Sequence, residues 1–144
     1  MFVLEGREVA EQYALDFVDA DRQLWANPVE VAINELFADI VREALDKDIL
    51  TQEDLFSTDR EVMEKLRESD NDFIDSRFDI LENQSFEIVE DDPDFVGHTK
   101  ARYVDPTVLD GNEVRRVTDY SDKLETEIMK HRKEVEDGFP VRID

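Results

Sequence analysis

The stretch from Asn27 to Asp46 is the strongest structural signal in the sequence. Its apolar residues recur every three or four positions, which places them on one face of an α-helix. Asn27 is a suitable N-cap, Pro28 suits the first helical position, and Glu30 can complete a capping box. The apolar residues of this face are Val29, Ala32, Ile33, Leu36, Phe37, Ile40, Ala44 and Leu45. Such a face must be covered by neighbouring segments, so we expect a helical core around it.

The segment before it has the same period and predicts a helix from about Gly6 to Ala26. That helix should end before Pro28, because the residue preceding a proline avoids the helical region. Asp21 interrupts its apolar side, and two interpretations are open. Asp21 is either a buried functional acid or an acid at the edge of the apolar face that reaches water or an arginine. We favour the second, since unpaired buried acids are rare.

Capping signals predict the remaining helices. A short turn begins near Thr51, and Thr58 with Glu61 forms a capping box for the helix that follows. Apolar spacing then predicts a helix that ends near Asn83. A last helix should run from Ser121 to Asp137, with Gly138 after its final turn.

Between residues 84 and 143 the pattern changes to short strands. They are expected at 86–88, at 101–104, in a hairpin around Gly111 and at 141–143. The predicted class is α+β: an N-terminal helical hairpin or bundle at 1–83, then a small, mostly antiparallel sheet with one packed C-terminal helix at 84–144. We expect one compact unit that is part of a larger protein.

The 144 residues carry 39 acidic and 17 basic side chains, a net charge of −22. Such a surface repels phosphate backbones and anionic membranes, and no apolar run approaches the roughly 18–20 residues of a membrane span. A cytoplasmic protein is the default expectation. The acidity has two explanations: a high-salt cytoplasm, or a surface that docks a basic partner.

The charge is uneven along the chain. Residues 1–97 carry a net charge of −20, whereas residues 98–144 carry 9 basic and 11 acidic side chains. The basic residues of this last third pair with nearby glutamates in one interpretation, and contact a nucleotide phosphate in the other. The candidates for phosphate contact are Arg102, Arg115, Arg116, Lys130, Arg132 and Lys133.

The residues predict no catalytic or metal-binding group in this chain. His98 and His131 stand far apart in the sequence, and the chain has no cysteine. The aspartate clusters at 70–75 and 91–94 lack the glycine and terminal glutamate of an EF-hand loop.

The order of these features resembles the region after the catalytic core in HD-domain phosphohydrolases of the deoxynucleoside triphosphate triphosphohydrolase type. The segments that carry this resemblance are Ala20-Asp21-Arg22, the Val31–Leu45 helix, Leu50 with Asp54-Leu55, Ser57-Thr58-Asp59 and Asp75-Ser76-Arg77-Phe78. The segment Lys100-Ala101-Arg102-Tyr103-Val104-Asp105-Pro106, with the sheet and helix after it, resembles the far C-terminal part of some prokaryotic members. In that family a histidine, a His-Asp pair and a further aspartate hold a divalent metal. Here His98 precedes a threonine and His131 an arginine, so the His-Asp pair is absent.

The resemblance therefore implies a C-terminal associated lobe that is inactive alone. Its catalytic HD core, with the divalent metal, would lie in the same polypeptide or on another chain. The lobe would help to assemble a homo-oligomer and border a nucleotide site. The alternative function is a free-standing acidic module for protein interaction or regulation.

Overall fold

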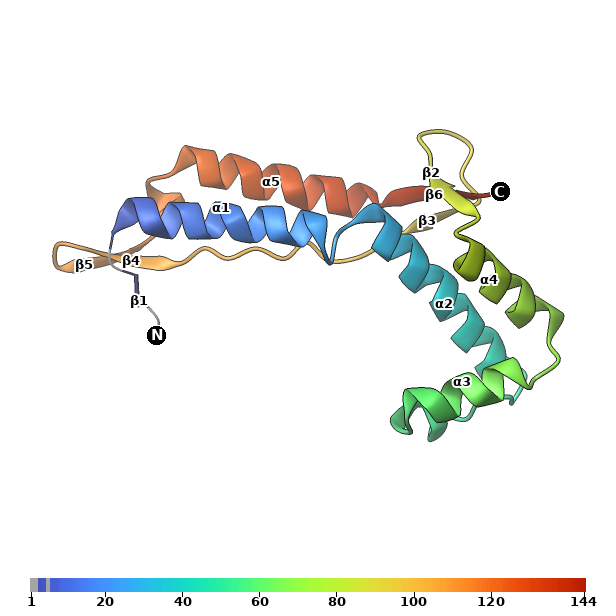
Figure 1. The fold of residues 1–144 in the computed structure, drawn as a ribbon. Helices are drawn as coiled ribbons and strands as arrows, with labels where there is room; N and C mark the ends of the chain where they lie inside the picture. Colours follow the sequence, from blue (N-terminus) through green and yellow to red (C-terminus); the bar gives the residue numbers. More distant parts are fainter. Residues whose placement is uncertain (1–2, 5) are drawn as a thin grey trace. The chain divides into compact units, whose positions relative to one another are not determined.

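The computed structural model describes residues 3–4 and 6–144. Within them the fold is α+β, as predicted (Figure 1). The helices are α1 (Arg7–Gln23), α2 (Pro28–Asp46), α3 (Asp59–Arg67), α4 (Asp72–Asn83) and α5 (Asp122–Asp137), with the short 3-10 turns η1 (Asp54–Phe56) and η2 (Val117–Asp119). The strands are β1 (Val3–Leu4), β2 (Phe86–Ile88), β3 (Phe95–Gly97), β4 (Thr107–Asp110), β5 (Glu113–Arg116) and β6 (Phe139–Ile143).

The chain forms two compact units, each built from two separate segments. Unit 1 comprises Met1–Val31 with His98–Phe139, and unit 2 comprises Ala32–Gly97 with Pro140–Asp144. The expected division after residue 83 follows the order of helices and strands along the sequence. The two units instead follow contacts in space, which join segments far apart in the chain.

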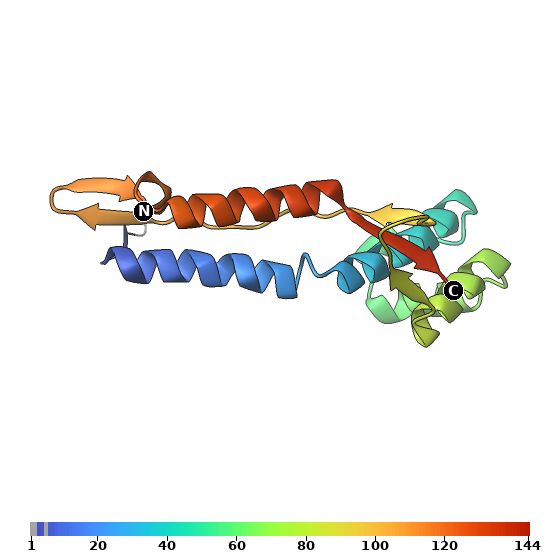
Figure 2. The same cartoon turned by 90° about the horizontal axis from the view of Figure 1, so that it is seen from above.

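In unit 1, α1 and α5 lie side by side (Figures 1 and 2). Their small and branched apolar residues meet in one core with β4 and η2. The buried members of that core are Ala10, Ala14, Val18, Val108, Val117, Leu124 and Ile128. β4 pairs with β5 in the predicted hairpin, which turns at Gly111 with a φ of 62°, and β1 pairs with β4 in parallel.

Both ends of α5 agree with the sequence prediction. The Ser121 hydroxyl accepts a hydrogen bond from the Leu124 backbone N–H at 3.1 Å, which caps the first turn. Gly138 follows the last turn with a φ of 77°, a conformation that glycine adopts without strain.

In unit 2, α2, α3 and α4 enclose an apolar core. Its buried residues are Ile40, Ala44, Leu50, Leu66, Ile74 and Phe78. The predicted capping box of α3 is present, with Thr58 and Glu61 bonded reciprocally. Asn71 caps α4 by accepting hydrogen bonds from the Phe73 and Ile74 backbone N–H groups. β6 lies between β2 and β3 in a second small sheet, antiparallel to β2.

The predicted strand at 101–104 is wrong. This segment forms no strand, and β3 lies earlier, at Phe95–Gly97. The Arg102 backbone N–H bonds to the Asp21 side chain of α1 instead of to a neighbouring strand. In place of the single sheet that we expected, two three-stranded sheets form among the described residues.

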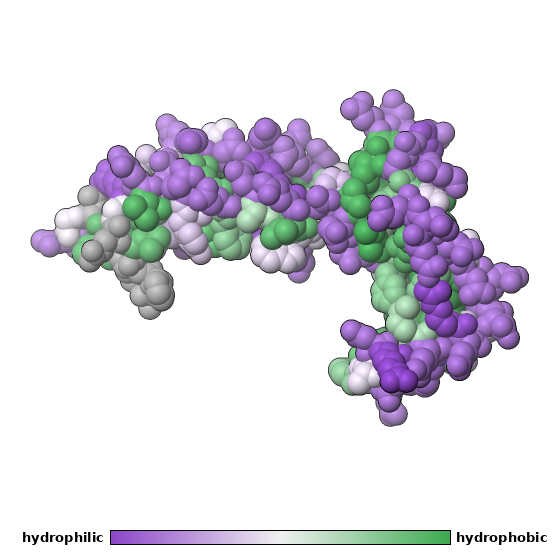
Figure 3. Space-filling model, in the orientation of Figure 1, coloured by the Kyte–Doolittle hydropathy of each residue, from purple (hydrophilic) through white to green (hydrophobic). Residues whose placement is uncertain are grey.

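Hydrophilic side chains cover most of the visible surface of each unit, as the composition requires (Figure 3). A stretch of hydrophobic surface nevertheless follows α2. Among the described residues, no helix combines the length and apolar character needed to cross a membrane.

Candidate functional site

A buried polar network of Asp21, Arg102 and His131 joins three segments of unit 1. Asp21 on α1 and His131 on α5 are both fully buried. The Nε2 atom of His131 lies 2.7 Å from Oδ2 of Asp21, and the Arg102 backbone N–H donates to the same oxygen at 2.7 Å. Nη1 of Arg102 reaches Oδ1 of Asp21 at 3.5 Å. The carboxylate therefore has a partner on each oxygen.

The network corrects the prediction for Asp21. We expected an acid at the edge of the apolar face, but the side chain has no exposed surface. It does reach an arginine, as that interpretation required. The partners lie 81 and 110 residues away in the sequence, so no local pattern indicates them. The only signal in the sequence is the interruption of an apolar stripe by one acid.

The network holds segments together and does not face a dissolved substrate. The His131 side chain is only 1% exposed, and its Nδ1 atom has no hydrogen-bond partner among the described residues. His131 and Arg22 line a pocket of about 220 Å³ in unit 1, and Nη2 of Arg22 is also buried without a partner there. The lining of this pocket is mostly apolar, and a pocket of this size has room for a water molecule that hydrogen-bonds to these nitrogens.

Arg22 is bound by carboxylates from both helices. Its Nη1 donates to Glu127 at 3.1 Å and to Asp19 at 3.4 Å, and its Nε donates to Glu134 at 3.3 Å. Burial lowers the pKa of Arg22, but the hydrogen bonds and charges of Glu127 and Glu134 outweigh burial and raise the pKa above its ordinary value. The charged form of Arg22 is thus held between α1 and α5.

A basic pocket lies on the same unit and contains one predicted phosphate contact. It encloses about 480 Å³ and is lined by Thr99, Lys100, Ala101, Tyr103, Arg132, Val135 and Glu136. The Arg132 guanidinium lies 6.0 Å from the centre of the Tyr103 ring, at the outer limit of a cation–π contact. Lys100, which we did not predict as a phosphate contact, joins Arg132 there.

The other predicted basic residues lie elsewhere. Arg102 is turned towards Asp21, with its guanidinium 5.7 Å from the Trp25 ring. Arg115 and Arg116 are exposed on β5, and Arg116 lies 3.7 Å from Asp105. Lys130 lies 3.9 Å from Glu134, whereas Lys133 is exposed on α5. The six candidates therefore do not form one cluster.

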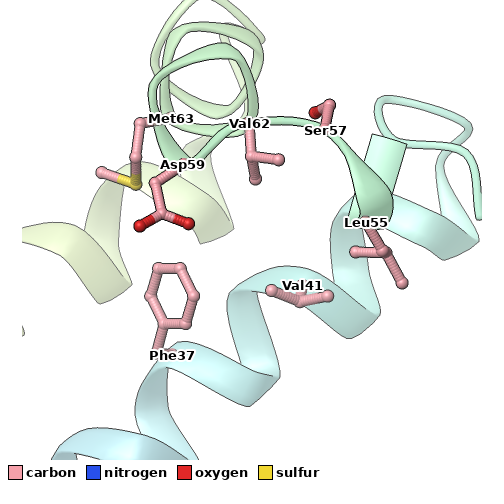
Figure 4. A pocket seen from close by; sticks show the side chains of 7 residues that line it. All are labelled: Phe37, Val41, Leu55, Ser57, Asp59, Val62 and Met63. Carbon is pink, nitrogen blue, oxygen red and sulfur yellow. The ribbon is translucent and has the colours of Figure 1, made fainter. Parts of the chain in front are cut away.

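Unit 2 contains an apolar groove of about 440 Å³ between α2, η1 and α3. Its lining residues are Phe37, Val41, Leu55, Ser57, Asp59, Val62 and Met63. Figure 4 shows the Phe37 ring and the Asp59 carboxylate turned towards each other from opposite sides of the groove. Phe37 is 36% exposed and Leu55 is 47% exposed, so the groove is open to solvent.

The described part of the chain includes no group of three or more histidine, aspartate or glutamate side chains placed to hold a metal ion.

The chain is similar to the uncharacterised protein YdhJ of Bacillus subtilis (strain 168), with 32% identity over 104 residues. The match covers 71% of this chain but 32% of the Bacillus protein, so the chain spans about a third of that relative's length. No family model and no solved structure matches the chain. In the Bacillus protein the matched stretch is part of a longer polypeptide.

Proposed function

We propose that this chain is the accessory lobe of an HD-domain phosphohydrolase of the deoxynucleoside triphosphate triphosphohydrolase type. In this role it helps to assemble a homo-oligomer and is inactive without the catalytic core, in cis or in trans. It borders a nucleotide site through the basic pocket. The divalent metal of that chemistry belongs to the catalytic core.

The basic pocket is the observation that carries the nucleotide part of the proposal. Lys100 and Arg132 line one hollow with the Tyr103 ring. Arginine and lysine bind phosphate oxygens through charge-assisted hydrogen bonds, and an aromatic ring stacks on a base. Glu136 lines the same hollow and repels an anion, so the phosphates should lie nearest Lys100 and Arg132.

The distribution of charge between the two units also favours unit 1 as the part of the chain that faces an anion. Unit 1 contains 17 acidic and 10 basic residues, a net charge of −7, whereas unit 2 contains 22 acidic and 7 basic residues, a net charge of −15. A nucleotide triphosphate is therefore repelled less by unit 1. The greater length of the Bacillus relative supports a lobe that works as part of a larger polypeptide.

The first experiment measures binding of a fluorescent deoxynucleoside triphosphate by anisotropy, with Arg132→Glu compared with Lys133→Glu. Both variants change the charge by the same amount on α5, but only Arg132 lines the pocket. We expect Arg132→Glu to weaken binding by about tenfold or more, because charge-assisted hydrogen bonds contribute about 1.5–3 kcal/mol. Lys133→Glu should change binding by less than about threefold, the effect of a screened surface charge. Equal losses in the two variants would place the nucleotide outside this pocket.

The assembly part is tested by light scattering in high salt, with and without a deoxynucleoside triphosphate and manganese, alongside a phosphate-release assay. We expect a dimer or larger assembly without hydrolysis. A monomer under all conditions would contradict the assembling role. Hydrolysis by the purified chain would show that the chain holds an active site of its own.

A further inference from the structure

We propose that the apolar groove of unit 2 is a docking site for a basic amphipathic helix of a partner protein. This docking role goes beyond the accessory-lobe function and does not depend on it. The residues that line the groove belong to unit 2, whereas those that line the basic pocket belong to unit 1.

The lining has the spacing that an amphipathic helix fits. Phe37 and Val41 are four residues apart and therefore lie on one face of α2, one turn from each other. Leu55 of η1 and Met63 of α3 complete the apolar walls. A partner helix inserts apolar side chains at positions i, i+3 or i+4, and i+7 into a groove of this kind. A volume of about 440 Å³ holds several such side chains.

A large aromatic side chain is exposed on η1, next in sequence to the groove residue Leu55. Phe56, the residue after Leu55, is 91% exposed, although it does not line the groove itself. Aromatic residues of this kind are frequent at the centre of protein interfaces. The short turn η1 thus contributes Leu55 to the groove and exposes a second large apolar side chain, Phe56.

The charge around the groove selects a basic partner. The Asp59 carboxylate lines the groove and has no hydrogen-bond or ion-pair partner among the described residues. Nearby cations are already bound: Lys65 lies 2.6 Å from Asp54, and Arg60 lies 2.9 Å from Glu64. Unit 2 as a whole has a net charge of −15. Such a surface attracts lysine and arginine beside the apolar anchors and repels acidic partners or nucleic acid.

The probe is a labelled synthetic peptide of leucine and lysine, about 15 residues long so that it can form a helix on binding, with leucine at the i, i+4 and i+7 positions. Two control peptides have the same leucines with glutamate in place of lysine, or the same composition in scrambled order. Anisotropy measures binding to the full chain. We expect the lysine peptide to bind, with weaker binding as salt is added, and the two controls to bind at least tenfold more weakly.

Two protein variants and one matched control locate the site. Phe37→Ala should weaken peptide binding by about tenfold, as for a central aromatic contact. The matched control is Phe73→Ala: Phe73 is 40% exposed on α4 of the same unit and does not line the groove, so binding should change by less than about twofold. Asp59→Asn replaces an exposed carboxylate without altering the core and should weaken binding several-fold.

Three results would overturn the proposal. One is equal binding of the lysine, glutamate and scrambled peptides, and another is equal loss in Phe37→Ala and Phe73→Ala. The third is a fall in the light-scattering mass of the chain alone on Phe37→Ala, because the occupant would then be a second copy. Nucleotide binding should be unchanged in Phe37→Ala, so failure of the docking site and failure of the nucleotide site are separate outcomes.

Discussion

The two units are stabilised in different ways. The buried polar side chains of the described chain, Asp21, Ser121 and His131, all belong to unit 1. The core of unit 2 is apolar, centred on Ile40 and Leu66. Unit 2 nevertheless carries about twice the net negative charge of unit 1.

This difference separates two physical roles. Burial of apolar surface has no direction, and it stabilises α2, α3 and α4 against strong repulsion between their exposed acids. The bonds of Asp21 are directional, and they join α1, α5 and the segment around Arg102 in one register. We infer that the stability of unit 2 depends mainly on its apolar core, whereas the stability of unit 1 depends also on one polar network.

The largest effect should come from a charge in the core of unit 2. Ile40 is fully buried, so Ile40→Asp should destabilise the protein by about 4 kcal/mol or more and unfold unit 2. Thermal melting followed by circular dichroism measures this loss. Ile88→Asp is the matched control, because Ile88 is 39% exposed in the same unit, and it should cost less than about 1 kcal/mol. Similar melting of both variants would show that Ile40 is not central to the core.

A slightly smaller effect is expected from breaking the polar network of unit 1. Asp21→Ala should cost about 3 kcal/mol, because it leaves the buried His131 and the partly buried Arg102 N–H without the carboxylate that they share. Urea unfolding measures the change. Asp19→Ala, which removes an exposed carboxylate two residues away, should cost less than about 1 kcal/mol.

The double variant Asp21→Leu with His131→Leu sharpens the comparison. Replacing both partners of a buried pair by apolar residues removes the need for a hydrogen bond, so much of the lost stability should return. If the double variant were as unstable as the sum of the single ones, the pair would not be a coupled unit.

Added salt should raise the stability of unit 2 more than that of unit 1. Screening weakens the repulsion among exposed acids, and the Debye length falls from about 10 Å at 0.1 M to about 3 Å at 1 M salt. Hydrogen exchange of α2–α4 amides, compared with α1 and α5 amides, measures the two units in one sample. If added salt changed the stability of neither unit, the high-salt explanation of the acidity would be wrong. The distinction between the two units based on charge would also fail.

The smallest effect concerns pH at the start of α3. The Lys65 ammonium lowers the pKa of Asp54, and the Thr58 backbone N–H lowers the pKa of Glu61. Their stabilising contributions are therefore complete above the ordinary carboxyl pKa of about 4 and are lost as pH falls through the lower folded values. An NMR titration should show η1 and the first turn of α3 loosening only in strong acid. Asp54→Asn should remove the part of this pH dependence that is due to Asp54. Loosening of these segments near neutral pH would contradict the assignment to Asp54 and Glu61.

Local signals in the sequence determined the helices. The capping box at Thr58 and Gly138 after the last helix are each explained by residues within a few positions, and the structure confirms both. The hairpin around Gly111 and the α+β class were predictable for the same reason. Propensity, capping and apolar period act over one or two turns, so they can be identified without knowing the fold.

The candidate sites depended on the tertiary structure. The carboxylate of Asp21 finds its partners 81 and 110 residues away, and Arg132 meets Lys100 and Tyr103 only because α5 packs beside the segment around residue 100. The groove likewise needs α2 and α3 to meet across η1. The sequence by itself determined which surfaces are apolar or charged. Packing between distant segments decided which of those surfaces meet, because burial and hydrogen bonding are satisfied only in the folded chain.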